Sequence, residues 1–208
     1  MNTTNTWSVW LDSLPLWAAL LPLGAYLLLL AAAHARRRPT VVSGTWDGIL
    51  LAVAVAGLAV AGPLALVRPA VGSTLWGWLI AALVFSLVVA VCILAARPRL
   101  VIYNVSAEQL RPLVAEVVTA LDADARWAGT TVALPARRLQ LHLDGAGGMR
   151  CSSVIAGGER AAHEAWTEFG RRLRQALGRL RVRPSPWAWA FTAAAAGVLA
   201  AAAAAAFR

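Results

Sequence analysis

Apolar residues are concentrated in four long uninterrupted runs along the chain. The runs are Leu14–Ala33, Ile49–Val67, Leu75–Ala96 and Trp187–Phe207, and none contains Asp, Glu, Lys, Arg or His. A helix needs about 20 apolar residues to cross a hydrocarbon core of ~30 Å. Lipid admits only helices and closed barrels, because backbone polar groups have no water there. The pattern therefore predicts four transmembrane helices.

The fourth run differs from the others because most of its residues are Ala. Its N-terminal flank supports a span, since an arginine-rich segment is followed by Pro184, Pro186 and two tryptophans. Small residues such as Gly57 and Ala61 suit close helix–helix packing within the membrane region. We expect a membrane region over 1–96, a domain over 97–184 and a C-terminal transmembrane helix over 185–208.

Residues 97–184 change to patterns typical of a folded α+β domain. A β-type run covers Arg99–Val105, and Ser106 with Gln109 forms a capping box that opens a helix with an apolar stripe. Strands are expected at Thr130–Leu134, at the alternating run around Leu141, and near Arg150–Ala156. A last helix is expected from about Glu159 to Val182, with an inner face of Trp166, Phe169, Leu173, Leu177 and Leu180.

These elements define the predicted fold class. It is an α-helical polytopic membrane protein with four transmembrane helices and a small cytoplasmic α+β domain. The domain has the order β-α-β-β-β-α and is inserted between the third and fourth spans.

Composition and charge agree with a membrane location and predict an orientation. Hydrophobic residues make up 60% and charged residues 14%, the net charge is +9, and every basic residue is arginine. Arginines concentrate in the first loop and in 97–184, which predicts both termini outside and the domain on the cytoplasmic side of an inner membrane. The expected topogenic or membrane-surface residues are Arg36, Arg37, Arg38, Arg97, Arg99, Arg171, Arg172, Arg174, Arg179, Arg181 and Arg183.

Tryptophan supports the same boundaries, because indole rings favour the headgroup level of a bilayer. Eight of the ten tryptophans lie in or beside the expected span ends. They are Trp7, Trp10, Trp17, Trp46, Trp76, Trp78, Trp187 and Trp189.

The strongest candidate for a catalytic site lies on a predicted β-hairpin. A turn centred on Ala146 and Gly147 would place His142 opposite Cys151, with Asp144 on the same face. A neighbouring histidine could lower the pKa of the thiol and create a nucleophile. The competing interpretation is an ordinary polar strand face, because a one-residue change of register separates the pair.

The sequence lacks the motifs of zinc proteases and of Walker-type nucleotide-binding sites. Thr167 stands where HExxH would need its second histidine, and the absence of lysine removes a Walker motif. No metal site and no cofactor are predicted. The arginine face of the last helix serves topology or anionic headgroups, and nucleic acid is not an expected partner.

The expected function is anchorage of a small cytoplasmic domain that binds a protein partner or a second copy of the chain, within the lipid bilayer. Two alternatives remain open. One is a membrane-bound enzyme that uses the Cys/His face, although an enzyme is the less favoured class. The other is a subunit of a multi-component transporter, although the spans carry no ionisable residue for a transport path.

Overall fold

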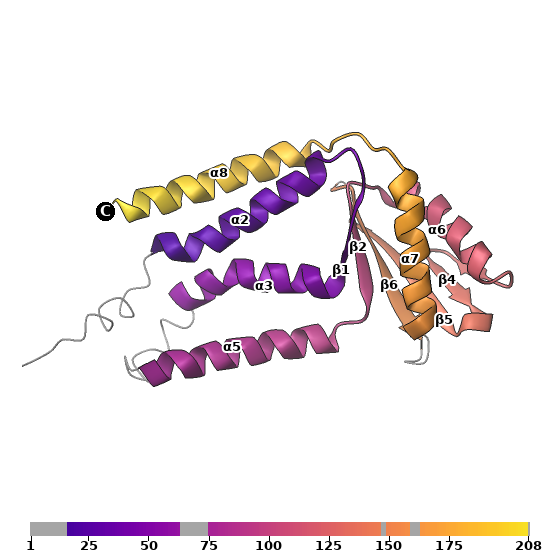
Figure 1. Cartoon of the computed structure of the whole chain (residues 1–208), viewed down its shortest axis with the longest axis horizontal. Coiled ribbons are helices and arrows are strands. Elements are labelled where there is room, and N and C mark those ends of the chain that lie inside the picture. Colours follow the sequence, from indigo (N-terminus) through magenta and orange to yellow (C-terminus); the bar gives the residue numbers. More distant parts are fainter. Residues whose placement is uncertain (1–15, 63–74, 147–148, 159–162, 208) are drawn as a thin grey trace, which may run out of the picture. The chain divides into compact units, whose positions relative to one another are not determined.

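The computed structural model describes residues 16–62, 75–146, 149–158 and 163–207 (Figure 1). The chain divides into two compact units. The first contains most of four apolar helices. The second contains Ala31–Asp47 and Ala96–Ala188 and includes every strand that the structure describes.

The helices of the first unit are α2 (Leu16–Ala35), α3 (Gly44–Ala61), α5 (Leu75–Ala95) and α8 (Trp187–Ala206). Small residues allow close approach between them. A Cβ atom added at Gly57 of α3 would lie 2.2 Å from the carbonyl oxygen of Ala19 on α2. A Cβ atom at Gly24 of α2 would lie 2.7 Å from Leu199 on α8. Packing at Gly57 follows the small-residue pattern seen in the sequence.

The prediction of four transmembrane helices is wrong for the part of the chain that the structure describes. Only α2 and α8 are long and apolar enough there to cross a membrane. Among the described residues, the apolar stretches of the other two helices are shorter and cover Gly44–Ala59 and Leu79–Ala95.

The boundaries of α3 show why the second expected span is too short. The expected span ran from Ile49 to Val67, but the helix ends at Ala61, before Gly62 and Pro63. Proline disfavours helical backbone at the preceding residue, and glycine weakens a helix. At its other end α3 begins at Gly44 and includes Asp47 in its first turn.

The second unit is built on a six-stranded antiparallel sheet with the order β1-β2-β6-β5-β4-β3. Its strands are β1 (Thr40–Ser43), β2 (Arg99–Tyr103), β3 (Arg126–Ala128), β4 (Thr131–Leu134), β5 (Leu139–Ala146) and β6 (Cys151–Gly158). A short 3-10 turn, η1 (Pro135–Arg137), joins β4 to β5.

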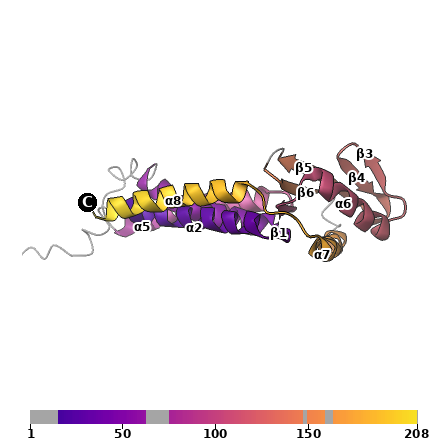
Figure 2. The same ribbon diagram turned by 90° about the horizontal axis from the view of Figure 1, so that it is seen from above.

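The core lies between one face of this sheet and two amphipathic helices, α6 (Ala107–Leu121) and α7 (His163–Arg179), which can be followed in Figure 2. Alternate residues of β5, including Leu139 and Leu141, point into the core, as the sequence alternation predicts. The buried stripe of α7 includes Phe169 and Leu173. The two helices therefore cover one sheet face only.

Local signals in the sequence are confirmed where they are strong. Ser106 and Gln109 form the expected capping box at the start of α6. Two strands were not predicted, β1 and β3, so the expected order β-α-β-β-β-α is incomplete. The first loop supplies β1, which joins the sheet edge beside β2.

Candidate functional site

The uncovered face of the sheet carries polar side chains from β4, β5 and β6. Gln140, His142 and Asp144 are exposed on β5, between Thr131 on β4 and Ser153 on β6. The His142 Nδ1 atom lies 3.1 Å from the hydroxyl of Thr131. This polar face, defined by these five residues, belongs to strands whose other face is packed against the core.

The expected alignment of His142 with Cys151 is wrong. His142 pairs with Ile155, whereas Cys151 pairs with Ala146 on β5 and with Tyr103 on β2. The hairpin is therefore longer than predicted, because its turn falls after Ala146 rather than on it. Ala146, which lies opposite Cys151, is four residues from His142 along β5. At ~3.4 Å per residue, this is a distance of about 14 Å along the strand.

The environment of Cys151 also opposes a nucleophilic role. The pKa of its thiol is raised from 9.0 to about 11, mainly by burial, because the thiolate is poorly solvated there. The negative charges of Asp47 and Asp144 act in the same direction, and Arg99 acts against them. A thiol with this pKa stays protonated near neutral pH, so a Cys/His nucleophile is not assembled.

A second polar cluster lies where the first loop meets β2. The hydroxyl of Tyr103 donates to Asp47 Oδ1 at 2.5 Å, and Arg99 Nη2 lies 3.5 Å from Asp47 Oδ2. The ring of His34 meets the ring of Tyr103 edge-on at a centroid distance of 5.7 Å. These contacts fix the start of α3 against the sheet. Arg99, predicted as a topogenic residue, therefore also has a carboxylate partner.

Two segments far apart in the sequence are joined by backbone hydrogen bonds, one where the chain enters the second unit and one where it leaves it. The amide of Val182 donates to the carbonyl of Arg37, and the amide of Ser185 donates to the carbonyl of His34, each at 3.0 Å. The side chain of Asn104 donates to the carbonyl of Arg36 at 2.8 Å. We call residues 34–38 and 181–185 the paired exit segments.

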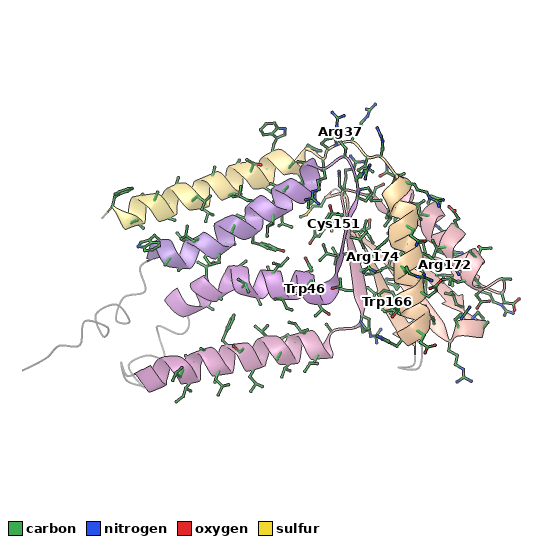
Figure 3. All side chains as sticks on the ribbon, in the orientation of Figure 1. Arg37, Trp46, Cys151, Trp166, Arg172 and Arg174 are labelled. Carbon is green, nitrogen blue, oxygen red and sulfur yellow. The ribbon has the colours of Figure 1, made fainter. Side chains whose placement is uncertain are left out.

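The paired exit segments form an arginine-lined pocket of about 460 Å³. It is lined by Arg37, Arg38, Arg181, Val182, Arg183 and Pro184. Of these residues Figure 3 labels Arg37, on the loop that follows α2. Sequence periodicity missed the pocket because its two sides come from residues more than 140 positions apart.

The prediction of a single arginine face on the last helix is wrong, because α7 ends before two of those arginines. The helix stops at Arg179, so Arg181 and Arg183 lie beyond it, on a segment without regular secondary structure. On α7, Arg172 and Arg171 both pair with Glu168, and hydrogen bonds from Arg172 and then Arg171 hold the pKa of the Glu168 carboxyl below its usual value. Arg174 is exposed on the same helix.

The remaining predicted residues occupy varied positions. Arg97 and Arg36 are exposed, as are Trp46 and Trp189, whose exposed fractions are 63% and 80%. Trp17 and Trp187 are half-buried. Trp7, Trp10 and the side chains of Trp76 and Trp78 lie outside the described residues.

Comparison with known proteins adds no homologue to this description. No protein family, no curated protein and no solved structure matches the chain. Across residues 16–62, 75–146, 149–158 and 163–207, no group of three or more His, Cys, Asp or Glu side chains is placed to hold a metal ion.

Proposed function

We propose that this chain is a membrane-anchored interaction protein, in which α2 and α8 insert into the membrane and the α+β domain binds a protein partner on the cytoplasmic side. The observation that carries the proposal is the one-sided construction of the domain. One sheet face is buried under α6 and α7, while the polar face remains open and rich in hydrogen-bonding groups.

Insertion is supported by the exposure of apolar side chains. Only 17% of the apolar window of α2 and 11% of that of α8 is buried within the chain. The core helix of a soluble protein would be mostly buried, because large exposed apolar surfaces are unfavourable in water. Membrane lipid provides the apolar surroundings that these helices lack.

The cytoplasmic orientation is supported by the charges at both helix ends. Arg36, Arg37 and Arg38 follow the C-terminus of α2, and Arg181 and Arg183 precede α8. Positively charged residues beside membrane spans are retained on the cytoplasmic side. These charges support a cytoplasmic location for the domain, which lies between the two helices in the sequence, at a bacterial inner membrane.

Partner binding is tested by photo-crosslinking in membranes of the source cells. A benzophenone amino acid replaces Gln140 or Asp144 on the polar face, and the matched control replaces Thr119, which is exposed on α6. We expect one adduct of defined mass from both face positions and none from Thr119. An adduct at twice 21.9 kDa identifies the partner as a second copy.

A second variant separates specific contact from chance proximity. Ser153→Arg places a bulky charge in the middle of the polar face, directly opposite Asp144. We expect it to abolish the adduct formed from position 140 and leave the amount of membrane protein unchanged. Equal crosslinking from Thr119, or an adduct insensitive to Ser153→Arg, refutes partner binding at this face.

A further inference from the structure

We infer that the arginine-lined pocket binds the phosphate group of an anionic lipid headgroup. Four of its six lining residues are arginines, Arg37, Arg38, Arg181 and Arg183. Guanidinium donors match the geometry of phosphate oxygens and form paired, charge-assisted hydrogen bonds with them. The volume of about 460 Å³ is within the usual range for small-molecule sites, ~300–1,000 Å³.

The charge of the pocket is not compensated within the described part of the chain. Arg99 has Asp47 beside it, and Arg171 and Arg172 share Glu168. None of the four pocket guanidinium groups has a described carboxylate within the 4.0 Å that defines those pairs. Converging like charges repel one another, so a bound anion stabilises this arrangement.

The backbone that carries these arginines is already fixed. Val182 is buried, with an exposed fraction of 7%, and its backbone amide donates to the carbonyl of Arg37, while its neighbours Arg181 and Arg183 are exposed. The guanidinium of Arg150 donates to the carbonyl of Arg183 at 3.2 Å. Binding therefore orders side chains but little backbone, which lowers its entropic penalty.

The place of the pocket in the chain identifies the source of the phosphate. Arg37 follows the last residue of α2, Ala35, by two positions, and Pro184 precedes Trp187 of α8 by three. Residues this close to two membrane helices lie at the headgroup level, where lipid phosphates are the concentrated anion. This source rests on the membrane insertion proposed above, whereas phosphate recognition itself does not.

The test uses the full-length protein in lipid-free detergent micelles, with two separate titrations. Native mass spectrometry follows binding of phosphatidylglycerol, with zwitterionic phosphatidylcholine as the comparison lipid. Calorimetry follows binding of inorganic phosphate. The pocket variant is Arg37→Gln/Arg181→Gln, and the matched control, Arg137→Gln/Arg174→Gln, removes the same charge from exposed positions elsewhere on the domain.

We expect the pocket variant to bind phosphatidylglycerol about 30-fold more weakly, from ~1 kcal/mol for each arginine. The control should change by less than about threefold. The variant Arg37→Lys/Arg181→Lys keeps the charge and the folded chain but removes the forked donors, and it should also weaken binding.

Three results would overturn all or part of the inference. An equal loss in the pocket and control variants shows attraction to net charge rather than a site. An unchanged affinity in the pocket variant removes the site altogether. If inorganic phosphate binding depends on the pocket arginines while phosphatidylglycerol binding does not, the phosphate site stands and the lipid source is wrong, even where α2 and α8 are inserted.

Discussion

The state of Cys151 provides a direct test of whether this domain can use a thiolate. Burial and the nearby carboxylates of Asp47 and Asp144 raise the pKa of the thiol from 9.0 to about 11. We therefore expect Cys151 to be alkylated slowly at neutral pH in the folded chain. A Cys92→Ser background leaves Cys151 as the only cysteine.

The size of the effect follows from the fraction of thiolate, which is the reactive form. At pH 8, a pKa of 11 leaves about one thiol in a thousand ionised, against roughly one in ten for a pKa of 9. Iodoacetamide should therefore react with folded Cys151 about 100-fold more slowly than with the unfolded chain. The rate should rise tenfold per pH unit until close to pH 11.

The pH profile distinguishes ionisation from simple steric shielding, because shielding lowers the rate equally at every pH. Asp47→Asn removes a negative neighbour and should move the inflection to lower pH, whereas the exposed control Asp124→Asn should not move it. An inflection at or below pH 9 in the folded chain would refute the electrostatic account and restore the possibility of a thiolate nucleophile.

Two further predictions concern packing and capping. Gly57→Ala should destabilise the detergent-solubilised protein by about 1–3 kcal/mol, because the new Cβ meets backbone atoms of Ala19. The control Gly197→Ala should be neutral or stabilising, because its Cβ would have no described atom from elsewhere in the chain within 4 Å. Equal shifts of the thermal midpoint in the two variants would contradict close packing at Gly57. Asp122→Ala should lower the free energy of unfolding by about 2–4 kcal/mol and Asp122→Asn by about half as much, since its buried carboxylate accepts from two backbone amides at 2.9 Å. Urea unfolding followed by tryptophan fluorescence measures both Asp122 variants, and an alanine variant no weaker than the asparagine variant would argue against the two-acceptor role.

The elements of the domain that could be predicted are those encoded by local patterns. The capping box at Ser106 and Gln109 needs only residues three apart, and the alternation around Leu141 needs only neighbours on one strand. Both signals depend on chemistry within a single element. Both features could therefore be predicted without knowing which residues pack against them.

The register of β5 and β6 could not be read in the same way. The predicted and observed partners of His142 on β6, Cys151 and Ile155, are four residues apart, an even number. An even shift keeps every side chain on the same face, so the hydrophobic pattern fits both registers equally well. Only the position of the turn distinguishes the two registers. That position decides whether His142 and Cys151 are cross-strand neighbours.

The arginine-lined pocket depends on two facts that no local pattern contains. The first is the end of α7 at Arg179, because of which Arg181 and Arg183 lie on the segment after the helix rather than on a helical face. The second is the hydrogen bond between Val182 and Arg37, which joins this segment to the first loop. A sequence-based count of arginines assigns all of them to one role, membrane topology. In the structure Arg99, Arg171 and Arg172 lie beside carboxylates, whereas Arg37, Arg38, Arg181 and Arg183 line one pocket, where we infer that an anion binds.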